Sequence, residues 1–171
     1  FKGHGQTFPV LILTIGFGMI GFIDDYIKVV KKRSDGLLAW QKLLMQIFVA
    51  LCFAFYVQKI SYVPLSMKIP FASGSVLDFG IFNIPIMIFI VVATVNGTNF
   101  TDGVDGLCSC VTIAVTVFFV IAAAAAASGV ITGGTAMIGA LMGFLLYNAY
   151  PAKVFMGDTG SLALGGFVTG M

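Results

Sequence analysis

Charged residues are scarce in this sequence of 171 residues, where lysine, arginine, aspartate and glutamate together make up 9%. A soluble domain has about 25%, so a water-facing globular fold is excluded. Glutamate is absent, because all seven acidic residues are aspartates. The net charge of +2 is small, and no basic stretch is interleaved with aromatic residues. We therefore expect no nucleic acid as a partner.

Cysteine and histidine are too few for a disulfide framework or a zinc site. His4 is the only histidine, and Cys52, Cys108 and Cys110 form an odd set without metal-ligand spacing. We interpret these thiols as small apolar side chains of helices. The chain begins without methionine and stops at Met171 within an apolar run, and we expect it to be an excerpt of a longer protein.

Apolar residues make up 59% of the chain, and its mean hydropathy is +1.06. A helix that crosses a membrane needs about 20 mostly apolar residues. Five runs approach this length, at residues 8–23, 43–57, 79–95, 111–127 and 130–149, and a sixth begins near residue 162. We predict an all-α, polytopic membrane helix bundle in one transmembrane domain over residues 1–171. Close helix contacts are predicted by Gly16, Gly18 and Gly21, and by Gly139 and Gly143.

Basic residues predict the orientation of the bundle. Four of them follow the first run directly, namely Lys28, Lys31, Lys32 and Arg33. Such residues beside a membrane exit mark the cytoplasmic side. Alternation of the spans then places three loops in the cytoplasm, at about residues 24–42, 96–107 and 148–161. On the outer side, the prolines, serines and glycine of residues 58–78 indicate turns or a short hairpin.

Five of the seven aspartates form three short clusters, one in each cytoplasmic loop: Asp24 with Asp25, Asp102 with Asp105, and Asp158. Carboxylates this close to a membrane are costly and normally functional or paired. Mg²⁺ prefers such oxygen ligands together with substrate phosphates, and the glycines beside Asp158 would present N–H groups to a phosphate. With Lys28 and Lys153 as nearby cations, the aspartates predict magnesium-dependent phosphoryl transfer at the membrane surface.

Each aspartate group also has a structural explanation. Asp24 and Asp25 would mark a solvated helix end, although the helix dipole disfavours two anions there unless the helix continues or a cation lies nearby. Asp102 and Asp105 would cap helices or form turns, and Asp158 would cap the sixth helix. An intramembrane aspartyl protease and a transporter are the other functional alternatives. They are weaker because the aspartates lie at membrane exits among lysines and glycines.

Three segments resemble the polyprenyl-phosphate N-acetylhexosamine-1-phosphate transferases: GFIDDYIKVVKKR, NFTDGVDGL and NAYPAKVFMGDTGSLALGG. Their order and spacing match across essentially the whole chain, and the third segment is the most specific. Phe100 and Val104 depart from the family's leucines. The resemblance implies a ten-helix membrane fold, of which this chain would cover the third helix to the start of the eighth. We expect the family's histidine-rich motif to follow residue 171.

The resemblance also implies the reaction. Phospho-N-acetylmuramoyl-pentapeptide would pass from its UDP carrier, UDP-N-acetylmuramoyl-pentapeptide, to undecaprenyl phosphate, with Mg²⁺ as cofactor, release of UMP and formation of lipid I. This enzyme of peptidoglycan synthesis would lie in the bacterial plasma membrane with a cytoplasmic active site. The alternative is a relative that transfers N-acetylglucosamine-1-phosphate. A one-step or covalent mechanism, and a homodimer, stay open.

Site residues follow from the same resemblance. Three aspartates are implied to be catalytic: Asp24, Asp25 and Asp158. The last of these matches the family's Mg²⁺ ligand, whereas one member of the adjacent pair would deprotonate the lipid phosphate or act as nucleophile. Four residues are implied to bind the nucleotide substrate: Lys28, Asn99, Asp102 and Asp105.

We predict that all three aspartate loops face the cytoplasm. Single cysteines replacing Asp25, Asp105 and Thr159, with the native cysteines removed, should react with a membrane-impermeant thiol reagent only in inside-out vesicles. Labelling of any one of them in right-side-out vesicles would contradict the topology.

Overall fold

The computed structural model describes residues 7–32, 35–59, 67–68, 76–77 and 79–171. Within these ranges the chain forms α1 (Thr7–Val30), α2 (Ala39–Lys59), α3 (Asn83–Thr101), α4 (Leu107–Ala125), α5 (Ile131–Asn148) and α6 (Gly157–Gly170). A 3-10 helix, η2 (Gly80–Phe82), precedes α3, and β1 (Met67–Lys68) pairs antiparallel with β2 (Val76–Leu77). The predicted all-α membrane bundle is confirmed, and the short strand pair lies in the segment predicted to form turns or a hairpin.

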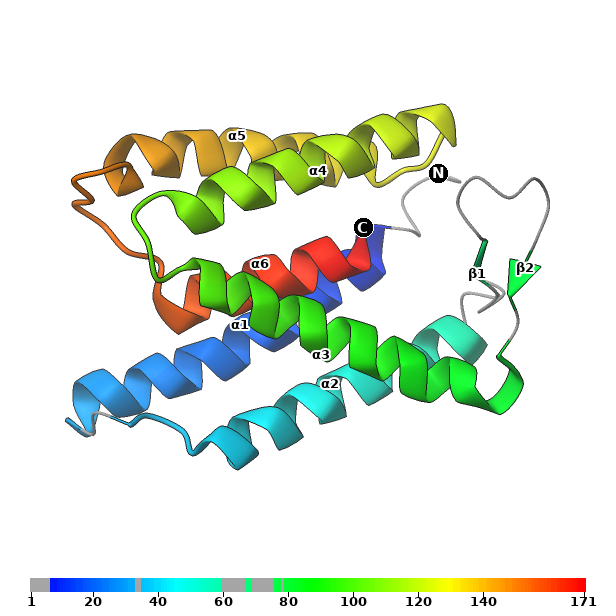
Figure 1. Cartoon of the computed structure of the whole chain (residues 1–171), viewed down its shortest axis with the longest axis horizontal. Helices are drawn as coiled ribbons and strands as arrows, with labels where there is room; N and C mark the ends of the chain where they lie inside the picture. Colours follow the sequence, from blue (N-terminus) through cyan, green and yellow to red (C-terminus); the bar gives the residue numbers. More distant parts are fainter. Residues whose placement is uncertain (1–6, 33–34, 60–66, 69–75, 78) are drawn as a thin grey trace.

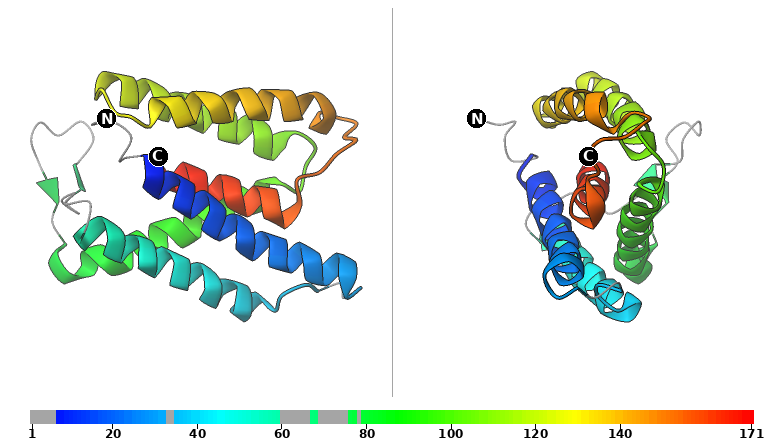
Figure 2. Two further views of the ribbon diagram at one scale, coloured as in Figure 1. Left: turned by 180° about the vertical axis from the view of Figure 1, so that it is seen from behind. Right: turned by 90° about the vertical axis from the view of Figure 1, so that its left-hand side faces the viewer.

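Five helices of the described residues, α1 to α5, are long and apolar enough to cross a membrane. The chain is therefore a multi-pass membrane protein. The shorter α6 lies at the centre, between α1 and α3, with α4 and α5 on one side and α2 on the other (Figure 1 and Figure 2). The carboxyl ends of α1, α3 and α5 and the amino ends of α2, α4 and α6 gather at one end of the bundle (Figure 1).

Glycines allow α6 to contact its two neighbours through the backbone. A Cβ atom at Gly21 of α1 would lie 2.1 Å from the carbonyl oxygen of Asp158. On α6, a Cβ atom at Gly165 or Gly166 would lie 2.6 or 2.7 Å from backbone atoms of α3 or α1. Since real Cβ atoms never come so close to backbone atoms, only glycine permits these helix separations. The close contact predicted for the first glycine group is confirmed at Gly21.

The second predicted glycine group, on α5, is different. Gly139 and Gly143 are exposed, and no atom of the described chain lies within 4 Å of a Cβ atom built at either one. The prediction of close contact there is wrong within this chain. The tightest contact of an α5 glycine is at Gly134, where a Cβ atom would lie 2.3 Å from a methyl group of Val120.

Apolar side chains of α1, α2 and α3 pack together with α6. The largest cluster consists of Leu13, Phe17, Ile20, Ala50, Val91, Val95 and Leu162. The outward faces of the same helices carry exposed apolar side chains such as Ile15, Phe48 and Phe89, which suits contact with lipid. The interior around α6 is thus mainly apolar, with individual buried polar side chains such as Gln46 and Thr116.

Several helices continue past the membrane boundaries that hydropathy predicts. The first span was expected to end at residue 23, but α1 continues through the aspartate pair to Val30. Likewise α2 begins at Ala39, α3 ends at Thr101 and α6 begins at Gly157. Hydropathy marks where apolar residues stop, whereas a helix continues as long as its polar residues find partners. At this end of the bundle the partners lie on another helix, as for Asp25 with α6, or on the same helix, as for Asp24 with Lys28.

We expect Gly21→Ala to destabilise the protein. The added methyl group would collide with the carbonyl oxygen of Asp158, and overpacking of this kind costs about 1–3 kcal/mol. The midpoint of thermal unfolding in detergent should fall by several degrees. Gly139→Ala is the matched control, because its methyl group meets open space and should leave the midpoint unchanged or slightly higher. Equal midpoints for the two variants would contradict the packing.

Candidate active site

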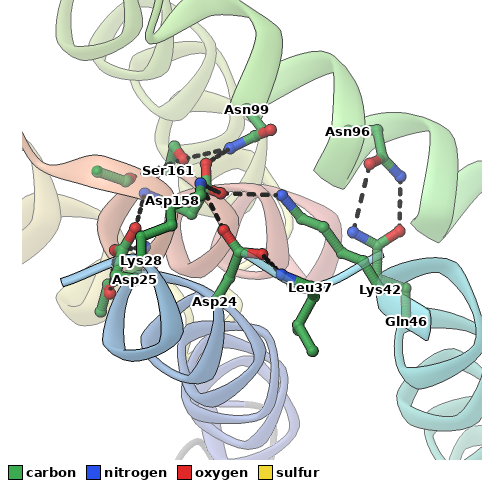
Figure 3. Close-up of polar contacts among 12 residues, drawn as sticks. Asp24, Asp25, Lys28, Leu37, Lys42, Gln46, Asn96, Asn99, Asp158 and Ser161 are labelled. Carbon is green, nitrogen blue, oxygen red and sulfur yellow. Dashed lines mark hydrogen bonds and ion pairs between the residues drawn. The ribbon is translucent and has the colours of Figure 1, made fainter. Parts of the chain in front are cut away.

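Polar side chains from four helices converge at the end of the bundle where the aspartate motifs gather. The aspartate pair and Lys28 come from α1, Lys42 from α2, Asn99 from α3 and Asp158 from α6 (Figure 3). Their side chains point toward one another in the space beyond the apolar core. The convergence predicted for the three motifs is therefore present for these residues.

Asp158 lies at the centre of the network. Its Oδ2 atom accepts hydrogen bonds from the ammonium groups of Lys28 and Lys42, at 2.8 and 3.2 Å. Its Oδ1 atom accepts one from the Asn99 amide at 2.8 Å, and the same amide donates to the Ser161 hydroxyl at 2.7 Å. The N-cap of α6 is Met156, so the interpretation of Asp158 as a helix cap is wrong.

Asp25 supplies the missing cap from another helix. Its carboxylate accepts hydrogen bonds from the backbone N–H groups of Asp158 and Thr159, at 3.3 and 2.8 Å, and from the Thr159 hydroxyl at 2.6 Å. A carboxylate suits the positive end of a helix dipole. We expected the N–H groups near Asp158 to bind a phosphate, but these two are already occupied by Asp25.

Asp24 is almost completely buried, with 2% of its surface exposed. Its Oδ2 atom lies 2.5 Å from the Lys28 ammonium group, and its Oδ1 atom accepts a hydrogen bond from the Leu37 N–H group at 2.8 Å. The loop approaches closely here because Gly36 has φ +58 and no side chain; a Cβ atom would lie 2.7 Å from Oδ1. A continuing helix and a nearby cation explain the acidic pair, so the solvated helix-end interpretation is wrong.

Asp102 immediately follows α3 and is half-buried. Burial, together with the negative charges of Asp158 and Asp25, raises the pKa of its carboxyl group to about 6. The raised pKa places Asp102 within the electrostatic reach of the acidic cluster. A carboxyl group with a pKa near neutrality is able to exchange protons at physiological pH.

Asp105 lies apart from the cluster and orders a neighbouring loop. Its Oδ2 atom accepts a hydrogen bond from the N–H group of Ala152 at 2.9 Å. Beside it, the buried Asn148 accepts from the Gly106 N–H group and donates to the Val154 carbonyl oxygen. Together they connect the start of α4 to the segment between α5 and α6. Asn148 was not among the residues predicted from the sequence, although a polar residue at the end of an apolar run was a usable signal.

The second cation of the site is Lys42, which was not predicted from the sequence. Lys153 was expected near the aspartates, but its side chain is exposed and the described ion pairs of Asp158 are with Lys28 and Lys42. Lys42 lies at the end of the predicted cytoplasmic loop of residues 24–42 and was not predicted to contact the aspartates. The available signal was its place at the amino end of a membrane span, on the side where the aspartates emerge.

Three carboxylates of the site have a donor set that fits Mg²⁺. Asp24, Asp25 and Asp158 each offer an oxygen atom, and these atoms lie within 4.8 Å of one another. All are hard oxygen donors of the kind that Mg²⁺ binds. The three carboxylates face two ammonium groups, from Lys28 and Lys42, so the cluster keeps an excess of negative charge that a divalent cation would neutralise.

Comparison with known proteins gives a consistent result. A model of glycosyl transferase family 4 matches residues 7–171. The chain is 51% identical to a phospho-N-acetylmuramoyl-pentapeptide-transferase of Clostridioides difficile, over 92% of the chain and 49% of the relative. Proteins of the same name from Acetivibrio thermocellus and Anoxybacillus flavithermus are 46% and 44% identical, each over 98% of the chain and 52% of the relative. The chain thus spans about half the length of these curated relatives, and the resemblance to phospho-sugar transferases is confirmed.

We expect Asp102→Asn to change how stability depends on pH. The carboxyl group has a pKa of about 6 in the folded protein against 3.8 ordinarily, so between these values the folded state holds more protons than the unfolded state. Raising the pH through this window therefore lowers the free energy of unfolding, and the loss persists at higher pH. Asparagine does not titrate in this range, so the free energy of unfolding of the variant should fall less than that of the wild type as the pH rises.

Thermal unfolding of the detergent-solubilised protein in EDTA, measured from about pH 4 to pH 7, checks this expectation. The difference between wild type and variant is the informative quantity, because the other carboxyl groups titrate in both proteins. Parallel profiles would contradict the raised pKa.

Proposed function

Because the chain belongs to glycosyl transferase family 4, we propose that it contributes the catalytic carboxylates of an enzyme that makes lipid I. Phospho-N-acetylmuramoyl-pentapeptide passes from UDP to undecaprenyl phosphate, and UMP is released. The observation that carries the proposal is the convergence of Asp24, Asp25 and Asp158 with two lysines at one end of the bundle. The names of the relatives favour this reaction over transfer of N-acetylglucosamine-1-phosphate.

Two anions must meet in this reaction. An oxygen atom of the lipid phosphate forms a bond to the sugar-linked phosphorus of the nucleotide, and the bond from that phosphorus to the UMP oxygen breaks. Little covalent work is left to the protein, so catalysis is mainly positioning and electrostatic stabilisation. The Lys28 and Lys42 ammonium groups, which meet at one oxygen of Asp158, supply positive charge for phosphate oxygens at this position.

The carboxylates have separable roles in the proposal. Asp158, held by three donors, would be the principal Mg²⁺ ligand, with Asp24 and Asp25 close enough to contribute oxygen atoms. The bound ion would neutralise charge that develops on the phosphates. One member of the adjacent pair would accept the proton of the lipid phosphate or act as nucleophile. Asn99 orients Asp158 through its amide.

Asp102 and Asp105 keep their proposed association with the nucleotide, in different ways. Asp102 lies close enough to the cluster for its charge to be felt there. Asp105 would act through the loop that it holds at Ala152. We place the site on the cytoplasmic face of a bacterial plasma membrane, because basic residues follow α1 and UDP-linked precursors are cytoplasmic. A homodimer stays a prediction.

We expect Asp158→Asn to reduce transferase activity in the full-length protein by orders of magnitude. Asparagine keeps the size of the side chain and an oxygen atom, but it removes the charge that a hard cation needs. Release of UMP from the nucleotide substrate, with Mg²⁺ and undecaprenyl phosphate present, measures the loss. Retention of more than about a tenth of wild-type activity, a loss of at most about 1.4 kcal/mol of transition-state stabilisation, would remove the metal assignment.

Two further substitutions complete this test. Asp24→Asn and Asp25→Asn should also be strongly impaired, and at least one of them should retain nucleotide binding if its role is on the lipid phosphate. Asp78→Asn serves as the control. Asp78 lies outside the described residues and is predicted to be on the outer side, so its variant should be close to wild type.

A further inference from the structure

A pair of amide side chains joins α2 to α3 within the bundle. The Asn96 amide donates to Gln46 Oε1 at 2.7 Å, and the Gln46 amide donates to Asn96 Oδ1 at 3.3 Å. The Asn96 amide also donates to the carbonyl oxygen of Val92, one turn back on its own helix, at 2.8 Å. Gln46 is almost fully buried, with 1% of its surface exposed. None of these atoms belongs to the acidic cluster.

The amide pair lies one helical turn from the site on both helices. Lys42 precedes Gln46 by four residues on α2, and Asn99 follows Asn96 by three residues on α3. Residues with these spacings share a helix face. Lys42 and Asn99 are the residues through which α2 and α3 hold the two carboxylate oxygens of Asp158. Figure 3 shows the amide pair between the two helices, and the Lys42 and Asn99 side chains directed at Asp158.

Among the described residues, the core that these two helices share is apolar. Ala50 of α2 and Val91 and Val95 of α3 belong to the same apolar cluster, and apolar contact is non-directional. Two reciprocal hydrogen bonds are directional, and both break if one helix rotates or moves by a turn of about 5.4 Å. Gln46 is buried, so leaving its amide without a partner is costly.

We propose that Gln46 and Asn96 are positioning residues that fix the register of α2 against α3, so that Lys42 and Asn99 reach Asp158 together. The kinetic part of this proposal rests on the transferase function proposed above. The geometric part does not, because the contact of Lys42 with Asp158 is measurable without turnover.

The test uses four variants of the full-length protein in detergent. Gln46→Leu and Asn96→Leu each replace one amide with an apolar side chain of similar size. The double variant Gln46→Asn/Asn96→Gln exchanges the two amides and conserves their combined length, so the pair is able to form again. Gln58→Leu is the matched control, since it makes the same chemical change at an exposed position of the same helix.

The first measurement is the acylation rate of the Lys42 amine by a small amine-reactive reagent, read by mass spectrometry. The ion pair with Asp158 protects this amine. We expect acylation to rise several-fold in both leucine variants, to return toward wild type in the exchanged variant and to be unchanged in Gln58→Leu. The exposed Lys153 should react equally in all proteins, which separates a local change from unfolding.

The second measurement is UMP release. A displaced Lys42 should lower kcat about 10- to 100-fold while the KM for the nucleotide stays within about twofold, because positioning acts mainly in the transition state. The exchanged variant should recover most of the lost rate. A general loss of folding would instead lower the amount of active enzyme in every variant and leave no recovery.

The outcomes separate the two proposals. Unchanged acylation of Lys42 in both leucine variants would overturn the positioning role, whatever happens to turnover. Increased acylation without recovery in the exchanged variant would also overturn it, because any damage to the interface would then suffice. If the wild-type protein releases no UMP but acylation follows the expected pattern, the transferase function fails and the positioning role stands.

Discussion

The contact between Gly21 and the Asp158 carbonyl group is the constraint on which the site depends. A side chain at position 21 would have no room, so the backbones of α1 and α6 meet directly at this point. One turn further along α1 lie the two aspartates, which are thereby brought to the first turn of α6. A side chain at position 21 would press against the first turn of α6, so the close approach of the aspartate pair to Asp158 depends on this glycine.

The charges of the site are arranged around this contact. Three carboxylates close together repel one another, and the structure offsets the repulsion with Lys28 and Lys42, the first from α1 and the second from α2. A partly buried site strengthens both the repulsion and the compensation, because water screens them less. Negative charge remains in excess, and this excess is what makes a divalent cation a suitable ligand there. The same charge distribution therefore connects the stability of the fold to the proposed chemistry.

Much of this organisation was predictable from the sequence. Hydropathy indicates how many helices cross the membrane, and the alternation of the spans indicates which loops share a face. The acidic cluster was predictable for the same reason, since Asp25 and Asp158 had to emerge at one end. Which side chains touch was not predictable. Lys42 replaced Lys153 as the second cation, and Asp105 turned toward a loop, because these contacts depend on helix rotation and on the path of a loop. Neither property leaves a periodic pattern in the residues.

The cap that Asp25 provides to α6 has a consequence for how substitutions in such a site are interpreted. In most helices the capping group belongs to a residue next to the helix in the sequence. Here the acceptor for the first turn of α6 comes from α1. The orientation of Asp158 therefore depends on Asp25, which lies 133 positions away in the sequence. A substitution of Asp25 therefore changes both the local charge and the orientation of the Asp158 carboxylate. A loss of activity in an Asp25 variant therefore does not show by itself that Asp25 takes part in the reaction. The hydrogen bonding of the α6 backbone N–H groups distinguishes loss of a reacting group from displacement of Asp158.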